Sequence, residues 1–269
     1  MRHVGRMPAA RSLAAALVPL RPYVRRAGQA LLDLLLPEPP PCPACRRPKE
    51  PDEPGMCPNC LERMPLLVPP LCRRCGQPLR GEAAQAELCR LCRQEGRFFA
   101  FARAPAVYDG AVKDWIHRFK YGGERELGEA LGVLMGRFLE RERVLWPLDA
   151  VVPVPLHPSR LQERGFNQAE VLAKAVGAWV GRPVWTDVLQ RARSTETQTK
   201  LPARARRDNV RGAFRSYRAQ RIAGKRLLLV DDVLTSGATA DEAARTLLKA
   251  GAAQVNVLCL AAGMLPEAW

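Results

Sequence analysis

The sequence predicts an α/β protein, with a mostly parallel sheet and helices on both faces, preceded by a small cysteine-rich domain. Two observations predict this fold class. After about residue 97, short apolar runs alternate with segments whose apolar residues recur at helical spacing, which is typical of βαβ units. Before that point, eight of the nine cysteines lie within residues 42–92. The 269 residues, 47% hydrophobic and 26% charged, suffice for one ordinary domain and a small module, and they exclude a wholly disordered chain.

The N-terminal extension, residues 1–36, only partly resembles a signal peptide. Three arginines precede an apolar run at 13–18, but Pro19 and further arginines stand where a cleavage site is expected. We therefore expect an extension that ends in an amphipathic helix over about 26–36. No run approaches the ~20 apolar residues that a bilayer helix needs, so we expect a cytoplasmic protein without a membrane span.

The cysteines form four Cys-x-x-Cys pairs separated by 11, 11 and 13 residues. Each pair places two thiolates on one side of a tight turn, and two pairs supply the tetrahedral four-sulfur shell that Zn²⁺ accepts. The pattern predicts a double zinc ribbon domain over residues 37–96 with two structural zinc sites. In the simplest, sequential pairing the ligands are Cys42, Cys45, Cys57 and Cys60 for one ion and Cys72, Cys75, Cys89 and Cys92 for the other. A crossed pairing stays open.

Four disulfides in a secreted protein are the alternative use of these cysteines. We favour zinc, because a disulfide within Cys-x-x-Cys is redox-active and a poor structural staple. No His or carboxylate stands at a ligand spacing that would leave an open coordination position, so the metal is expected to be structural. Cys259 lies alone in an apolar run and is expected to be a buried core residue.

The third predicted domain spans residues 97–265. A strand or hairpin arm is expected at 98–108, and Asp109 is expected to cap a helix that runs to about Lys120. A second helix is predicted from about 124 to 143. Further strands are expected at 150–154, 184–189, 227–230 and 254–260, with helices at 167–180 and 238–249. This alternation favours parallel pairing of the strands.

Positive charge is concentrated in one segment of this domain. The chain has a net charge of +15, and residues 191–226 hold twelve basic and two acidic residues. Such a block attracts an anionic partner, either nucleic acid or polyphosphate, but a solvated loop that keeps a protein soluble has the same composition. The interval between the flanking strands is too long for an idle connection in a compact domain, which favours a functional loop.

The run Leu-Leu-Leu-Val-Asp-Asp-Val-Leu-Thr-Ser-Gly-Ala-Thr occupies residues 227–239. Asp231 and Asp232 follow four apolar residues, at the C-terminal end of a predicted strand, where open α/β sheets bind ligands. The small residues after them let backbone N–H groups and hydroxyls surround a phosphate at the start of the next helix. The run lacks both the P-loop lysine and the three spaced glycines of a dinucleotide site. An acidic pair beside a phosphate-binding turn fits a sugar phosphate.

This run resembles the signature of the type I phosphoribosyltransferases. The resemblance implies that Asp231 and Asp232 approach the ribose hydroxyls of phosphoribosyl pyrophosphate (PRPP), which is bound with Mg²⁺. It assigns the 5′-phosphate to Thr235, Ser236, Gly237, Ala238 and Thr239. The candidates that it implies for contacting pyrophosphate, and for the flexible loop that closes over the site, are His157, Arg160, Arg164, Gln198 and Arg206.

Four features together resemble the ComF family, also called competence protein F. They are the paired cysteine turns, Val-Pro-Val-Pro-Leu at 152–156, Arg-Gly-Phe-Asn-Gln at 164–168 and the loop at 231–239. The similarity covers about residues 28–265, and the residues before it have no counterpart, which puts the start codon in doubt. Ser236 stands where the family prefers threonine, and it keeps the hydroxyl.

The resemblance implies a PRPP-binding protein that acts in DNA uptake during natural competence, with single-stranded DNA and proteins of the competence machinery as partners. The alternative is an active Mg²⁺-dependent phosphoribosyltransferase of nucleotide metabolism, whose acceptor and catalytic residues no pattern in the sequence identifies. The basic block offers only Phe214 and Tyr217 as rings on which bases could stack, so aromatic residues lend single-strand binding little support.

Overall fold

The structure is a computed structural model that covers most of the chain. The residues that it describes are 39–50, 53, 55–193 and 208–264. The helix expected at 26–36 and the candidate loop residues Gln198 and Arg206 lie outside the described residues. From Pro41 onward the described residues belong to one compact unit, so the cysteine-rich segment is in contact with the sheet. No helix within the described ranges is both long enough and apolar enough to span a bilayer.

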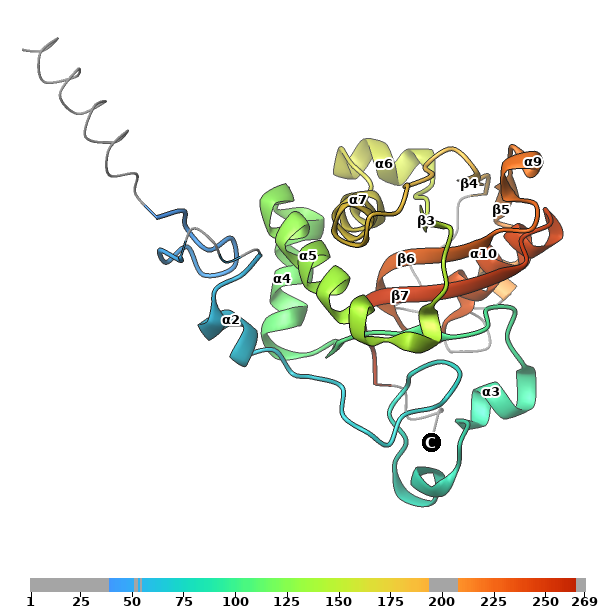
Figure 1. The fold of residues 1–269 in the computed structure, drawn as a ribbon, viewed down its shortest axis with the longest axis horizontal. Helices are drawn as coiled ribbons and strands as arrows, with labels where there is room; N and C mark the ends of the chain where they lie inside the picture. Colours follow the sequence, from blue (N-terminus) through green and yellow to red (C-terminus); the bar gives the residue numbers. More distant parts are fainter. Residues whose placement is uncertain (1–38, 51–52, 54, 194–207, 265–269) are drawn as a thin grey trace, which may run out of the picture. The chain divides into compact units, whose positions relative to one another are not determined.

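The core of the fold is a parallel sheet with the strand order β1-β7-β6-β3 (Figure 1). Its strands are β1 (Ala102–Arg103), β2 (Ala106–Val107), β3 (Ala150–Pro153), β6 (Arg226–Leu234) and β7 (Gln254–Ala262). The short β2 also pairs with β7, and every pairing in this sheet is parallel. A separate antiparallel pair consists of β4 (Leu189–Arg191) and β5 (Phe214–Ser216).

The strand β6 is longer than predicted and contains the acidic pair. β3 ends at Pro153, opposite Val230, whereas β7 pairs with β6 as far as Leu234. Asp231 and Asp232 therefore have a strand neighbour on one side only. This edge of the sheet, beyond the end of β3, is where the candidate site lies.

Residues 184–189 do not form the expected strand. The structure has a single parallel bridge between Val184 and Val151, and the chain then continues into β4, which pairs with β5. The ladder does not continue toward the C-terminus of this segment, because the next donor on β3 would be residue 153, and Pro153 has no N–H group.

Helices cover both faces of the sheet, as predicted (Figure 1). The long helices are α4 (Gly110–Tyr121), α5 (Arg125–Arg141), α7 (Gln168–Val180) and α10 (Ala238–Lys249). Because side chains alternate along a strand, Leu228 and Val230 pack in the core under α4, α5 and α7, while Leu227 and Leu229 pack in the core under α10. The shorter helical segments are α2 (Pro58–Glu62), η1 (Gly81–Gln85), α3 (Arg90–Glu95), η2 (Arg143–Leu145), α6 (Pro158–Arg164) and α9 (Ala219–Ile222).

The helices α5 and α7 pack closely because two glycines of α5 face α7. A Cβ atom added to Gly132 would lie 2.5 Å from the Cβ atom of Ala175, and one added to Gly136 would lie 2.7 Å from the Cβ atom of Trp179. Both distances are shorter than van der Waals contact between carbon atoms. Glycine at these two positions therefore permits the close approach of the helices.

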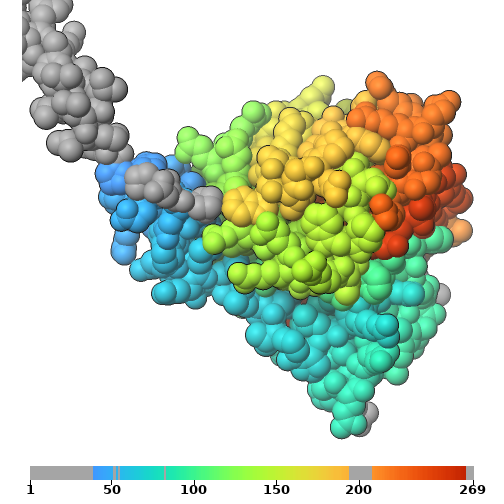
Figure 2. All heavy atoms as spheres, viewed as in Figure 1, coloured from blue at the N-terminus to red at the C-terminus, as the bar shows by residue number. Residues whose placement is uncertain are grey.

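The cysteine-rich segment packs on the sheet in two halves. The first ribbon, residues 41–62, shares the core of α4 and α5, to which its Met56 contributes. The second ribbon, residues 71–95, shares the core of α10, to which its Leu79 contributes. Figure 2 shows the second ribbon in cyan and teal, packed against the neighbouring part of the chain. Each ribbon thus completes a different apolar core.

Candidate functional site

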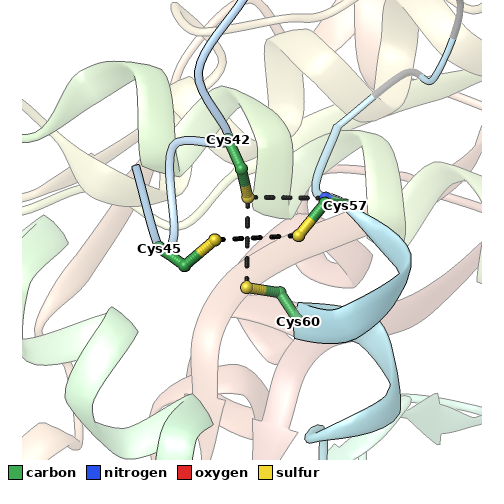
Figure 3. A group of neighbouring side chains, drawn as sticks. All are labelled: Cys42, Cys45, Cys57 and Cys60. Carbon is green, nitrogen blue, oxygen red and sulfur yellow. Dashed lines mark hydrogen bonds between the residues drawn. The ribbon is translucent and has the colours of Figure 1, made fainter. Parts of the chain in front are cut away.

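Each ribbon brings four cysteine sulfur atoms together, and Figure 3 shows those of the first ribbon. Within each group all Sγ atoms lie within 4.8 Å of one another. The distance is 3.7 Å between the sulfurs of Cys45 and Cys57 and 3.6 Å between those of Cys75 and Cys89. Sulfurs bound at about 2.3 Å to a tetrahedral Zn²⁺ lie about 3.8 Å apart, whereas a disulfide bond is about 2 Å long. Four thiolates at this spacing fit a structural zinc ion.

The grouping settles the pairing of the cysteines. The sequential alternative is the one observed, with groups Cys42, Cys45, Cys57, Cys60 and Cys72, Cys75, Cys89, Cys92. All nine cysteines are free thiols, so the disulfide alternative is absent from the structure. Cys259 is buried in the core under α10, as expected.

Backbone N–H groups prepare the thiols of both ribbons for metal binding. The N–H of Cys57 donates to the Sγ of Cys42 at 3.4 Å, and the N–H of Cys89 donates to the Sγ of Cys72 at 3.3 Å. Such bonds favour the thiolate, which is the form that binds a metal. The same arrangement occurs in both ribbons, which therefore have the same local design.

A pocket of about 390 Å³ lies beside Asp231 and Asp232. Its walls come from α4, the segment after β3, α7, β4 and the loop between β6 and α10. Thr235 and Thr239 of that loop line the same pocket. The acidic pair and the loop predicted to bind phosphate therefore face one space, at the carboxyl edge of the parallel strands.

An ion pair crosses this pocket between α4 and β6. The Nζ atom of Lys120 lies 2.7 Å from the Oδ2 atom of Asp232, and their side chains are only 18% and 14% exposed. Burial disfavours the charge of Lys120, but the carboxylates of Asp232 and Asp231 outweigh burial and raise the pKa of Lys120. The lysine is therefore a fixed cation next to the acidic pair.

Asp231 has a strongly perturbed carboxyl group. Its Oδ1 atom accepts a hydrogen bond from the N–H of Asp232 at 2.9 Å. Burial, together with the neighbouring charge of Asp232, raises the pKa of Asp231 to about 7. A carboxyl group with this pKa is partly protonated at neutral pH. A ligand that brings hydroxyl donors or a cation to the carboxyl group would favour its ionised form.

Cationic side chains surround the rest of the pocket, which Arg160, Arg164 and Arg191 line. Arg164 donates through Nη1 to the Oε1 atom of Gln168 at 3.1 Å, and its guanidinium lies 5.3 Å from the ring centre of Tyr121. The Nε of Arg164 and the Nε2 of Gln168 are buried and meet no acceptor within the described part of the chain. Buried donors normally have acceptors, so these two atoms are an unexplained feature of the pocket wall.

The loop residues between the two threonines face away from this pocket. Ser236, Gly237 and Ala238 are buried, and the Oγ of Ser236 accepts a hydrogen bond from the N–H of Ala238 at 3.4 Å. Gly237 has a φ of 75°, a left-handed conformation that glycine adopts without strain and that turns the chain into α10. The structure therefore brings the acidic pair and both ends of the predicted loop together.

The candidate His157 lies apart from the pocket lining. Its Nδ1 atom accepts a hydrogen bond from the N–H of Ser159 at 3.3 Å and so caps α6. By contrast, sequence reasoning missed Lys120 as a site residue. Lys120 follows Val112 and Ile116 at steps of four, so it lies on the buried face of its helix, and a charge in that position indicates a buried partner.

Comparison with protein families matches two segments of the chain. The double zinc ribbon domain matches residues 31–95, and the phosphoribosyl transferase domain matches residues 163–267. The DNA utilization protein YhgH of Salmonella typhimurium is 34% identical over 226 residues, which are 81% of this chain and 95% of that protein. Competence protein F of Haemophilus influenzae is 29% identical over 211 residues, 77% of this chain and 90% of that protein. The chain belongs to the ComF family.

Other ComF relatives are more distant in sequence. Competence protein ComFC of Bacillus subtilis is 26% identical over 208 residues, which are 76% of this chain and 82% of that protein. The expected order of a double zinc ribbon followed by a phosphoribosyltransferase-like α/β fold is confirmed. In this ComF chain, the acidic pair and its loop lie within the phosphoribosyl transferase match, whereas Lys120 precedes it.

Proposed function

We propose that this ComF protein binds PRPP with Mg²⁺ in the pocket beside Asp231 and Asp232. The proposal depends on one observation, that the acidic pair and Thr235 and Thr239 line the same pocket. Carboxylates accept hydrogen bonds from adjacent ribose hydroxyls, and the start of a helix favours a phosphate group. The match to the phosphoribosyl transferase domain supports the same class of ligand.

In this proposal the candidate residues divide the ligand among them. Asp231 and Asp232 hold the ribose, and the cationic wall with Arg160 and Arg164 holds the pyrophosphate. The 5′-phosphate is held at Thr235 and Thr239, which line the pocket, and the buried Ser236, Gly237 and Ala238 shape the turn between them. Mg²⁺, when bound with the ligand, neutralises part of the pyrophosphate charge. Gln198 and Arg206 stay candidates for the loop that closes over the site. His157, which caps α6 and is not part of the pocket lining, stays a candidate for the pyrophosphate contact only.

We further propose that the protein acts in DNA uptake and utilization in the cytoplasm, with single-stranded DNA and proteins of the competence machinery as partners. The names of its relatives support this process. Charge supports a nucleic-acid partner, because Arg211, Arg215 and Arg218 of the basic block are exposed. Stacking of bases on aromatic rings gives this proposal little support. Phe214 is buried, and only Tyr217 is an exposed ring in the described part of this block.

Ligand-induced stabilisation tests the PRPP site. We expect PRPP with Mg²⁺ to raise the melting temperature of the full chain, by the equivalent of about 2.7 kcal/mol at a hundredfold excess over Kd. The double variant Asp231→Asn, Asp232→Asn should lose this shift, while Asp114→Asn, a change at an exposed acid on α4, should keep it. An intact protein that shows no shift would contradict the proposal.

Two further measurements test for transferase activity at this site and for binding of single-stranded DNA. Release of pyrophosphate from bound PRPP in the presence of nucleobases or amines would identify an active transferase. For the DNA partner, we expect binding of a single-stranded oligonucleotide to weaken steeply with rising salt. The absence of binding at low salt would remove the nucleic-acid partner from the proposal and leave the PRPP site in place.

A further inference from the structure

The side chain of Gln77 joins the second ribbon to the loop after β6. Its Nε2 atom donates to the carbonyl oxygens of Leu234 and Thr235 at 3.4 and 3.2 Å. The residue is only 3% exposed, and its Oε1 atom is buried without a donor among the described residues. An incompletely paired amide is costly to bury. The two hydrogen bonds to the loop offset part of this cost, which indicates that they have a role in the structure of the loop.

The turn that carries Gln77 is the turn that carries two metal ligands. The N–H of Cys72 donates to the carbonyl of Gln77 at 2.8 Å, and the N–H of Gly76 donates to the carbonyl of Cys72 at 2.9 Å. Gly76 has a φ of 68°, and a Cβ atom there would lie 2.8 Å from the carbonyl oxygen of Ala102. The position of Gln77 is therefore set by the fold of the turn around Cys72 and Cys75.

This turn is also fixed to the central sheet. The N–H of Ala102 donates to the carbonyl of Arg74 at 2.7 Å, and Arg103 donates through Nη2 to the carbonyl of Arg73 at 2.9 Å. Ala102 and Arg103 form β1, which pairs with β7. The cysteine turn is thus held against the sheet, and Gln77 of this turn holds the loop after β6.

Very little space separates the second ribbon from the loop. A cavity of only about 10 Å³ lies between them, lined by Cys75, Cys89, Ser236 and Gly237 among others. This volume is at the lower limit for one water molecule, so a ligand cannot occupy it. A shift of the cysteine turns would therefore be transmitted to the loop by direct contact.

The first ribbon has no comparable contact within the described residues. Its backbone is held by α4, where Arg118 donates to the carbonyl of Ala44 at 2.6 Å and to that of Pro43 at 3.1 Å. Its core residues belong to the face of α4 and α5. The two clusters, although alike in their cysteines, therefore differ in what they support.

We propose that Gln77 is a positioning residue through which the second four-cysteine cluster holds the loop at residues 234–239 in its binding shape. The next step rests on the function proposed above, in which the loop binds the phosphate of PRPP. In that case metal bound at this cluster raises the affinity of the pocket for PRPP. Linkage makes the effect reciprocal, so each ligand raises the affinity for the other by the same factor. The first cluster lacks this coupling.

Hydrogen exchange of the full, zinc-loaded chain tests the structural half of this proposal without any PRPP. In Gln77→Met, which keeps the size of the side chain and removes the donor, amides of the loop should exchange about tenfold faster. Gln85→Met changes an exposed residue of the same ribbon and should leave the loop unchanged. Equal loop exchange in the two variants, at equal zinc content, would overturn the proposal. If Gln77→Met does not fold, Gln77→Leu, which also lacks the donor, replaces it.

A second comparison tests whether the effect is specific to one cluster. Cys92→Ser should accelerate exchange of the loop, whereas Cys60→Ser should not, and equal acceleration in both would contradict the assignment.

PRPP titration then separates the two proposals. A wild-type protein that does not bind PRPP refutes the proposed function and leaves the exchange result standing. A wild type and a Gln77→Met variant with the same Kd for PRPP refute the coupling alone.

Discussion

At the scale of single residues, the acidic pair depends on a cation from another part of the chain. Lys120 pairs with Asp232 in a largely buried position, so Lys120→Met would leave a buried carboxylate without its partner. We expect this change to lower the free energy of unfolding by about 3 kcal/mol, the lower end of the range for breaking a buried pair, because the pocket admits water. Urea denaturation measures this loss. Lys113→Met, at an exposed position of the same helix, is the control, and equal stability of the two variants would contradict the prediction.

The raised pKa of Asp231 predicts a pH dependence of stability. The folded chain binds the proton of this carboxyl up to about pH 7, whereas the unfolded chain releases it near the ordinary aspartate pKa of 3.8. The folded state therefore holds more protons in this window, and its stability falls as pH rises toward 7. Compared with Asp231→Asn at the same pH, the wild type should lose unfolding free energy between pH 5 and 7 and change little above that. A constant difference across this range would show that Asp231 has an ordinary pKa.

At the scale of secondary-structure elements, the sequence predicts the helices well and the edges of the sheet poorly. The helix expected at 238–249 is observed as Ala238–Lys249, because its apolar positions and its preceding glycine are local features. The helix α6 is absent from the predicted elements, although Pro158 at its first turn and Gly165 at its end are helix signals. The helical spacing indicates that Lys120 has a buried partner, but which residues Lys120 and Gln77 contact depends on the tertiary fold, and no local pattern identifies those partners.

The close approach of α5 and α7 predicts a cost for adding one methyl group. In Gly132→Ala the new Cβ atom would meet the Cβ atom of Ala175 at 2.5 Å, so the helices must separate. We expect a loss of about 1–3 kcal/mol of stability from overpacking, although alanine is the better helix former. Thermal or urea unfolding measures the loss. Arg137→Ala, on the exposed side of the same helix, should change stability by less than about 0.5 kcal/mol, and a Gly132→Ala variant as stable as this control would refute the prediction.

At the scale of the whole molecule, the sequential pairing of the cysteines predicts the metal content. The intact chain should hold two zinc ions, measured by elemental analysis against protein concentration. Cys57→Ser with Cys60→Ser should leave one ion, and Cys89→Ser with Cys92→Ser should leave the other. Because both clusters contribute to cores of the sheet, removal of both ions by a chelator should lower the melting temperature of the entire described unit. Loss of both ions from either double variant would indicate metal sites that depend on each other.

The packing of one ribbon on each face of the sheet limits how this chain can be divided. A fragment that starts at residue 97, the proposed boundary of the third domain, would expose apolar surface on both faces at once, since Met56 and Leu79 cover different cores. Such a fragment should aggregate rather than fold alone. The two ribbons, residues 41–62 and 71–95, are thus part of the same folded unit as the sheet. Insertions, fusions or recombination between the ribbons and the rest of the chain would be tolerated only where both apolar cores stay covered.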